Sequence, residues 1–163
     1  MSRAPQIAVI GKGTPDDELA PLAHEVGGLL AEAGAVIVCG GLGGVMEDAA
    51  RGASAAQGTV IGIVPSSSPE QASRYCTHVV ASGVGHGRNL AVVASGDAVI
   101  AIGGEWGTLS EIAYARELDR PVIALRSWTV SGSGAMEGGP GIEVVSDPAG
   151  AVELALRSAR PGA

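Results

Sequence analysis

The chain has 163 residues, enough for one domain (1–163) with a substantial buried core. Its formal net charge of −7 and sequence pI of about 4.8 exclude the basic surface typical of nucleic-acid-binding proteins. Hydrophobic residues make up 46% of the chain but aromatic residues only 2%, so we expect a core of aliphatic side chains and not of rings.

The first half of the chain alternates apolar runs with helical patterns. Residues 7–10 predict a strand, and the acids at 16–18, after Pro15, predict the first turn of a helix that Gly34 ends. Residues 35–39 and 60–64 predict the next two strands, with a helix between them that follows a run of glycines. Residues 66–76 carry no regular pattern.

The second half continues the alternation. Residues 78–81 predict a weaker strand, and a short helix follows from about Arg88 to Ser95. Residues 98–102 and 121–125 predict further strands with a helix between them. The Gly- and Ser-rich residues 127–141 predict a loop, 142–145 a last strand, and 149–158 a helix that begins after Ser146-Asp147-Pro148.

This order of elements predicts an α/β fold, a three-layer, doubly wound parallel sheet of six or seven strands. Right-handed crossovers bring the loops after the first, second, fourth and fifth strands to one edge, where such sheets bind ligands. Amide-rich turns at helix N-termini favour phosphate there. The residues expected to form this site are Gly11, Gly13, Thr14, Gly40, Gly41, Gly43, Gly44, Met46, Arg88, Asn89, Gly103, Gly104, Gly107, Thr108 and Glu111.

The signatures of other nucleotide and metal sites are missing from the sequence. The dinucleotide fingerprint G-x-G-x-x-G does not follow the first strand, and "GGLGGVM" has Met46 in place of its last glycine. The P-loop pattern G-x-x-x-x-G-K-[ST] does not occur either. No set of His, Cys and acidic residues has zinc spacing, so we predict no metal site.

Cys39 and Cys76 form no C-x-x-C pair, and Cys39 lies in an apolar run where a small buried side chain is expected. No signal peptide and no stretch long enough to span a bilayer is predicted. We therefore expect a cytoplasmic protein without membrane or nucleic-acid partners.

Thr108 and Glu111 admit two interpretations. Their T-x-x-E spacing fits a capping box, in which Thr108 caps a helix and Glu111 returns a hydrogen bond to its backbone. Glu111 also lies beside the predicted phosphate site, where a carboxylate could take part in chemistry. Arg88 stands at a helix start, where the dipole disfavours a cation unless an anionic partner is present. Arg88 is therefore a candidate to hold a phosphate or carboxylate.

At "GGLGGVMEDAARGA", "GRNLAVVASGDAVIAIGG" and "GTLSEIAYA" the sequence resembles the LOG-like (Lonely Guy) Rossmann family, and most closely its bacterial branch similar to molybdenum-cofactor carrier proteins. LOG enzymes cleave the N-glycosidic bond of cytokinin nucleoside 5′-monophosphates with a P-G-G-x-G-T-x-x-E motif. Gly104, Gly107, Thr108 and Glu111 match this motif, and Arg88 resembles its upstream arginine, which works with the last glutamate of the motif. The resemblance therefore implies that Arg88 and Glu111 are the candidate catalytic residues. Carrier proteins of the same fold hold the phosphate of molybdopterin without known turnover.

The sequence also departs from the LOG motif. Gly103 stands at its proline, Glu105 at its second glycine, and Asn89 where the hydrolases have lysine. Asn89 removes a charge that is favourable for phosphate and Glu105 adds an unfavourable one, which favours binding over hydrolysis. The leading hypothesis is a binder of a nucleotide or phosphate-bearing cofactor, either molybdopterin-like or a nucleoside monophosphate; the alternative is a nucleoside 5′-monophosphate phosphoribohydrolase.

Two further expectations concern chemistry and assembly. Many relatives carry a lysine decarboxylase label, but a pyridoxal-phosphate enzyme needs a Schiff-base lysine and the only lysine here, Lys12, lies in a glycine turn. We reject that activity.

The helices carrying "LAVVA" and "LSEIAYA" have apolar or small residues on more than one face, and the resemblance implies contacts between subunits there. Both predict a homodimer or homotetramer.

Overall fold

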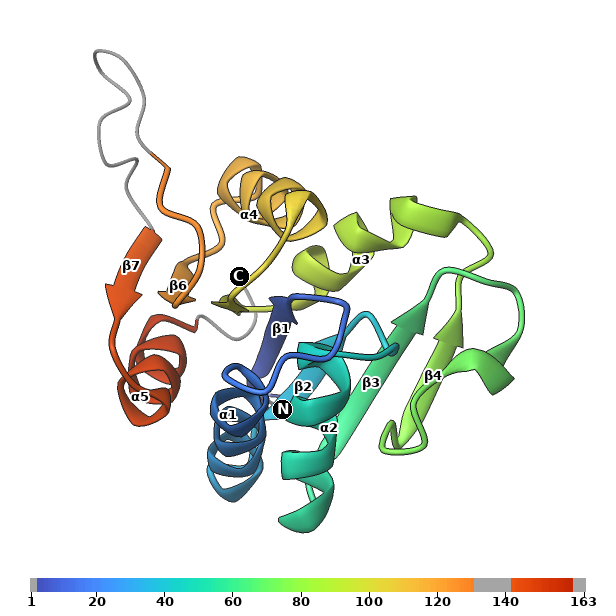
Figure 1. Cartoon of the computed structure of the whole chain (residues 1–163), viewed down its shortest axis with the longest axis horizontal. Helices are drawn as coiled ribbons and strands as arrows, with labels where there is room; N and C mark the ends of the chain where they lie inside the picture. The colour runs from blue at the N-terminus through green and yellow to red at the C-terminus, as the bar shows by residue number, and fades with distance from the viewer. Residues whose placement is uncertain (1–2, 131–141, 160–163) are drawn as a thin grey trace.

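The computed structural model describes residues 3–130 and 142–159, which form a layered α/β fold (Figure 1). Helices and strands alternate along nearly the whole described chain. In chain order the elements are β1 (Gln6–Gly11), α1 (Ala20–Glu32), β2 (Val36–Cys39), α2 (Val45–Ala55), β3 (Thr59–Val64), η1 (Pro69–Gln71), β4 (His78–Ala81), η2 (Gly85–Gly87), α3 (Arg88–Ser95), β5 (Ala98–Ile102), α4 (Trp106–Glu117), β6 (Val122–Leu125), β7 (Ile142–Val145) and α5 (Pro148–Ser158).

All strand pairs in the sheet are parallel, and the strand order is β4-β3-β2-β1-β5-β6-β7. Helices α1, α2 and α5 pack on one face, and α3 and α4 pack on the other (Figure 1). The prediction of a three-layer, doubly wound parallel sheet is confirmed, with seven strands in the described part of the chain.

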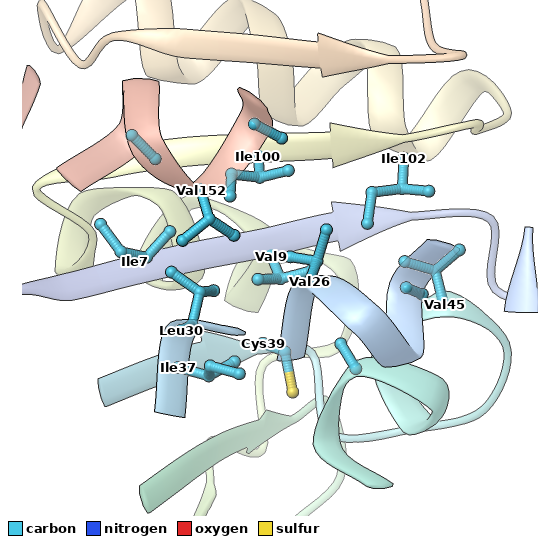
Figure 2. Close-up of a cluster of buried hydrophobic side chains, with 14 of the residues drawn as sticks. Ile7, Val9, Val26, Leu30, Ile37, Cys39, Val45, Ile100, Ile102 and Val152 are labelled. Atoms are coloured by element: carbon cyan, nitrogen blue, oxygen red, sulfur yellow. The ribbon is translucent and has the colours of Figure 1, made fainter. Parts of the chain in front are cut away.

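The core is aliphatic, as the composition predicts. Every residue of β5 is buried, and Ile7, Val9 and Ile100 meet Val26 and Leu30 of α1 in the cluster shown in Figure 2. Central strands are continuously apolar because helices cover both of their faces. No helix among the described residues is long and apolar enough to cross a bilayer.

Helices α1 and α2 lie unusually close together because glycines face the contact. A Cβ on Gly27 would lie 1.9 Å from the carbonyl oxygen of Ala49, and one on Gly52 would lie 1.9 Å from that of His24. No side chain fits at either position without moving a backbone. This close contact packs α1 and α2 together on one face of the sheet, and the ends of the strands they cover carry the candidate site.

The start of α1 differs from its prediction. The helix begins at Ala20, so the acids at 16–18 precede it and do not form its first turn. The Asp16 carboxylate instead accepts hydrogen bonds from the amides of Glu18 and Leu19 and from the Lys12 ammonium. Such local bonding competes with the helix and makes a separate turn. Of the predicted loop 127–141, residues 131–141 lie outside the described part.

Candidate functional site

A cavity of about 310 Å³ opens at the C-terminal edge of the central strands, and we call it the Arg88 cavity. Its wall comes from the end of β1, the loops after β1, β2 and β5, the η2 turn, and the first turns of α2, α3 and α4. The lining residues are Val9, Ile10, Gly11, Gly13, Gly40, Leu42, Met46, His86, Arg88, Asn89, Glu105, Gly107, Thr108 and Glu111.

Arg88 is the first residue of α3, and only 8% of it is exposed. Its Nη2 donates to the Gly40 carbonyl at 3.3 Å, and its Nη1 donates to the side-chain oxygen of Asn89. The Nε is buried with no hydrogen-bond partner among the described residues. Burial lowers the pKa of Arg88 while Glu111 opposes the shift, but a guanidinium stays charged at neutral pH. The cavity wall therefore holds a buried cation whose Nε is unused by the described residues.

Gly40 makes room for that guanidinium. A Cβ at this position would lie 2.8 Å from Arg88 Nη2 and 2.5 Å from the Met46 sulfur. With no side chain at the end of β2, the guanidinium can lie against the strand backbone and donate to its carbonyl. The first glycine after β2 is thus required for the arginine to occupy the site.

Glu111 lies in the second turn of α4, is only 7% exposed and lines the cavity. No hydrogen bond reaches its carboxylate from the described residues. Burial raises the pKa of the Glu111 carboxyl to about 7, against the opposing effect of the Arg88 charge. At neutral pH the group can therefore either hold or release a proton beside the cavity.

The capping-box interpretation of Thr108 and Glu111 is wrong. Helix α4 begins at Trp106 with Glu105 as its N-cap residue, and no side chain caps it. Thr108 is therefore already inside the first turn, and Glu111 lies too far along the helix to reach the cap. The first-turn amides have no intrahelical partners, and Gly107 and Thr108 carry two of them into the cavity wall.

The loop between β5 and α4 is held by the segment after β6. The Ser127 hydroxyl donates to the Gly103 carbonyl, and the Trp128 indole N–H donates to the Glu105 carbonyl at 3.2 Å. Gly103 and Gly104 both have positive φ angles, +58° and +125°, which glycine adopts readily. The turn at Gly103 and Gly104 therefore determines where α4 begins. It also determines the direction of the unpaired amides in the first turn of α4.

A second cavity, of about 490 Å³, lies on the other side of this loop. It is lined by Lys12, Asp16, Leu19, Gly103, Gly104, Arg126, Ser127, Trp128 and Thr129. Lys12 is paired with Asp16 at 2.9 Å, and this contact raises the pKa of Lys12, with a smaller contribution from Glu105. The only lysine of the chain is thus already paired with a carboxylate, that of Asp16.

The structure brings most of the predicted site residues together. Gly11, Gly13, Gly40, Met46, Arg88, Asn89, Gly107, Thr108 and Glu111 line the Arg88 cavity. Gly103 and Gly104 line the second cavity.

Four predicted residues line neither cavity: Thr14, Gly41, Gly43 and Gly44. Thr14 is exposed, while Gly41 is buried against Gly62 of β3. Gly44 is the N-cap residue of α2. The glycine run after β2 therefore serves mainly to turn the chain from strand to helix.

Sequence reasoning missed Val9, Ile10 and Leu42. Val9 and Ile10 belong to a strand whose apolar residues give no indication that its end faces a cavity. Leu42 stands inside the glycine run, where nothing distinguishes it from a turn residue. His86 and Glu105 also line the Arg88 cavity. No group of His, Cys, Asp and Glu in the described chain could hold a metal ion.

The fold and the position of this cavity place the chain in the Rossmann-like α/β class. It belongs to the SLOG cluster4 family, whose model matches residues 4–149. An uncharacterized protein of Archaeoglobus fulgidus is 43% identical over 121 residues, covering 74% of this chain and 80% of that one.

Solved structures support the same assignment. The molybdenum cofactor binding protein from Rippkaea orientalis matches with a TM-score of 0.85 and 34% identity, over 95% of this chain and 97% of that one. The molybdenum cofactor carrier protein from Chlamydomonas reinhardtii matches with a TM-score of 0.82 and 28% identity, over 95% of this chain and 98% of that one. The resemblance noted in the motifs is confirmed. DNA processing protein A from Helicobacter pylori, at 19% identity and a TM-score of 0.71, shares the fold.

Proposed function

We propose that the protein binds a phosphate-bearing cofactor of the molybdopterin class in the Arg88 cavity. The observation that carries this proposal is the buried Arg88 guanidinium, whose Nε has no partner among the described residues. Leaving such a donor unpaired is costly, and an anionic oxygen would form a charge-assisted hydrogen bond with it. A neutral ligand would not compensate the buried charge.

The surroundings of Arg88 also fit a phosphate. The first-turn amides of α4, at Gly107 and Thr108, face the same cavity, and the helix dipole adds positive potential there. Glu105 would repel an anion there, and Lys12, which interacts with Glu105, is itself paired with Asp16. The choice of a pterin cofactor rests on the 34% identity to a molybdenum cofactor binding protein.

Arg88→Gln tests this proposal, and Arg120→Gln provides a matched control. Among the described residues the Nε of Arg120 is also buried without a partner, and its Nη2 also donates to a carbonyl, that of Ala94, but Arg120 lines neither cavity. We expect a pterin phosphate to raise the melting temperature of the wild type and of Arg120→Gln. Arg88→Gln should lose roughly 10- to 100-fold in affinity, as expected for one charged hydrogen bond.

Inorganic phosphate and adenosine monophosphate in the same assay separate a pterin preference from general anion binding. Mass spectrometry of the protein purified without added ligand would identify any bound molecule directly. If no anion raises the melting temperature of the wild type, or if both variants lose the response equally, the proposal is wrong.

The alternative function, nucleoside 5′-monophosphate phosphoribohydrolase, is favoured by one observation: Glu111 has a pKa of about 7 and faces the cavity near Arg88. Glycosidic cleavage passes through an oxocarbenium-like state that a carboxylate can stabilise. An enzyme would release free base from a monophosphate, and Glu111→Gln would abolish this while still binding the ligand. Absence of free base with wild type and every monophosphate tested would reject the alternative.

We further propose that the chain self-associates through α3 and α4. Leu90 and Tyr114 are exposed on these neighbouring helices, and Trp106 is 76% exposed at the start of α4. Large exposed apolar side chains of this kind are typical of interaction surfaces.

A further inference from the structure

Cys39 and Cys76 lie side by side although they are far apart in the sequence. Cys39 is the last residue of β2 and pairs in register with Gly62 of β3. A Cβ on Gly62 would lie 2.6 Å from the Cys76 sulfur and 3.4 Å from the Cys76 Cβ. The Cys76 thiol thus occupies the space that a side chain at position 62 would fill, on the strand next to Cys39.

This arrangement brings the two thiol side chains into contact. Register partners on neighbouring strands lie about 4.8 Å apart, and their side chains point to the same face. The Cβ atoms of a disulfide need to approach to about 4 Å, a separation consistent with this placement. Both cysteines are free thiols, Cys39 completely buried in the core shown in Figure 2 and Cys76 half-buried at its edge.

The local chemistry gives the two thiols different roles. A hydrogen bond from Cys39 lowers the pKa of the Cys76 thiol, which favours its reactive thiolate. The contact with Cys76, together with complete burial, raises the pKa of Cys39 well above its usual value. Cys76 is also partly exposed, whereas Cys39 is completely buried.

We propose that Cys39 and Cys76 form a redox-active dithiol that a low-molecular-weight disulfide oxidises to an intramolecular disulfide. The Cys76 thiolate attacks one sulfur of the reagent R–S–S–R, whose S–S bond breaks and releases R–S⁻. Cys39 then loses its proton and attacks the Cys76 sulfur, breaking the mixed disulfide and releasing a second R–S⁻. The two protein thiols lose two electrons, and the reagent leaves as two thiols carrying both protons.

The second step becomes easier once the first has occurred. The hydrogen bond with Cys76 is the largest cause that raises the pKa of Cys39, followed by burial and then by the charge of Cys76. In the mixed disulfide Cys76 no longer carries that charge. The amide of Gly41 donates to the Cys39 sulfur, and the amide of Ser73 donates to the Gly41 carbonyl. The dithiol is therefore joined by hydrogen bonds to the loop whose first residue, Gly40, holds Arg88.

Incubation of the full chain with oxidised glutathione tests the proposal without any ligand, so its outcome is independent of the proposed function. After alkylation of the remaining thiols, we expect a species with the mass of two hydrogen atoms lost and no alkyl group. Without reduction, trypsin should release peptide 13–51, with Cys39, joined to peptide 75–88, with Cys76.

Two variants define the order of events. Cys39→Ala should stop at a mixed disulfide between glutathione and Cys76. Cys76→Ser should take up no glutathione while folded, because Cys39 is buried. The proposal is overturned if the wild type keeps both thiols free, or if it stops at the same mixed disulfide as Cys39→Ala.

Discussion

Arg88 and Glu111 present opposite charges to one buried wall, and each shifts the other's ionisation. Desolvation has the larger effect on the pKa of Glu111, because its carboxylate has lost water without gaining a hydrogen bond from the described residues. The folded protein therefore favours the protonated form of this carboxyl, and this preference has a measurable effect on stability.

We predict that Glu111 makes the protein less stable as the pH rises. Its pKa is about 7 when folded against 4.5 ordinarily, so the folded state binds the proton more tightly than the unfolded state. The resulting stabilisation is fully present below the unfolded pKa and is lost as the pH rises through 7. Between pH 5 and pH 8 the free energy of unfolding should fall by about 2–3 kcal/mol.

Urea denaturation of wild type and Glu111→Gln at several pH values measures this effect, because glutamine cannot titrate. The difference in stability between the two proteins should change with pH by that amount. Glu117→Gln, an exposed substitution on the same helix, should follow the wild type. Parallel curves for wild type and Glu111→Gln would contradict the prediction.

At the scale of single residues, most of the candidate site could be predicted from the sequence. Arg88 at a helix start and glycines after buried strands are local anomalies that a sequence displays directly. The burial of Glu111 and the use of Gly40 as space for Arg88 depend on four segments meeting at one edge. No local pattern encodes such distances.

Among the elements, the contact between α1 and α2 gives the sharpest test. We predict that Gly27→Ala destabilises the protein by several kcal/mol, because its Cβ would lie 1.9 Å from the Ala49 carbonyl oxygen. Gly28→Ala is the matched control, since its Cβ would lie 3.7 Å from the nearest atom, the Gly52 carbonyl oxygen, and alanine favours helix by about 1 kcal/mol.

Thermal or urea denaturation of both variants decides the matter. Gly28→Ala should equal or exceed the wild type in stability, whereas Gly27→Ala should unfold far earlier. Equal stability of the two variants would show that α1 can move away from α2 without cost, against the prediction.

The errors in element boundaries also have a physical cause. Helix α4 starts earlier than the T-x-x-E pattern suggests, because Gly103 and Gly104 turn the chain and a segment after β6 holds that turn. Helix α1 starts later than its acids suggest, because Asp16 bonds to nearby amides and to Lys12. Strands were easier to predict, since a buried parallel strand is a continuous apolar run.

At the scale of the whole molecule, we predict a homo-oligomer assembled through α3 and α4. Light scattering at micromolar concentration should give a mass at least twice the chain's 16.0 kDa. A double variant, Leu90→Glu with Tyr114→Glu, should dissociate it, because charges would enter an apolar contact. Val144→Glu, at a residue 66% exposed on β7, serves as the control and should stay assembled. A monomeric wild type would contradict the prediction.

The strand order has a consequence for how the chain folds as it leaves the ribosome. β1 is central, yet its neighbour β5 is made long after β2, β3 and β4, which complete the sheet on its other side. Until then β1 presents an open row of amides and carbonyls along an apolar edge, the kind of edge that recruits foreign strands. A nascent chain stalled after β4 should therefore aggregate or engage chaperones, whereas one extended through β6 should become resistant to both.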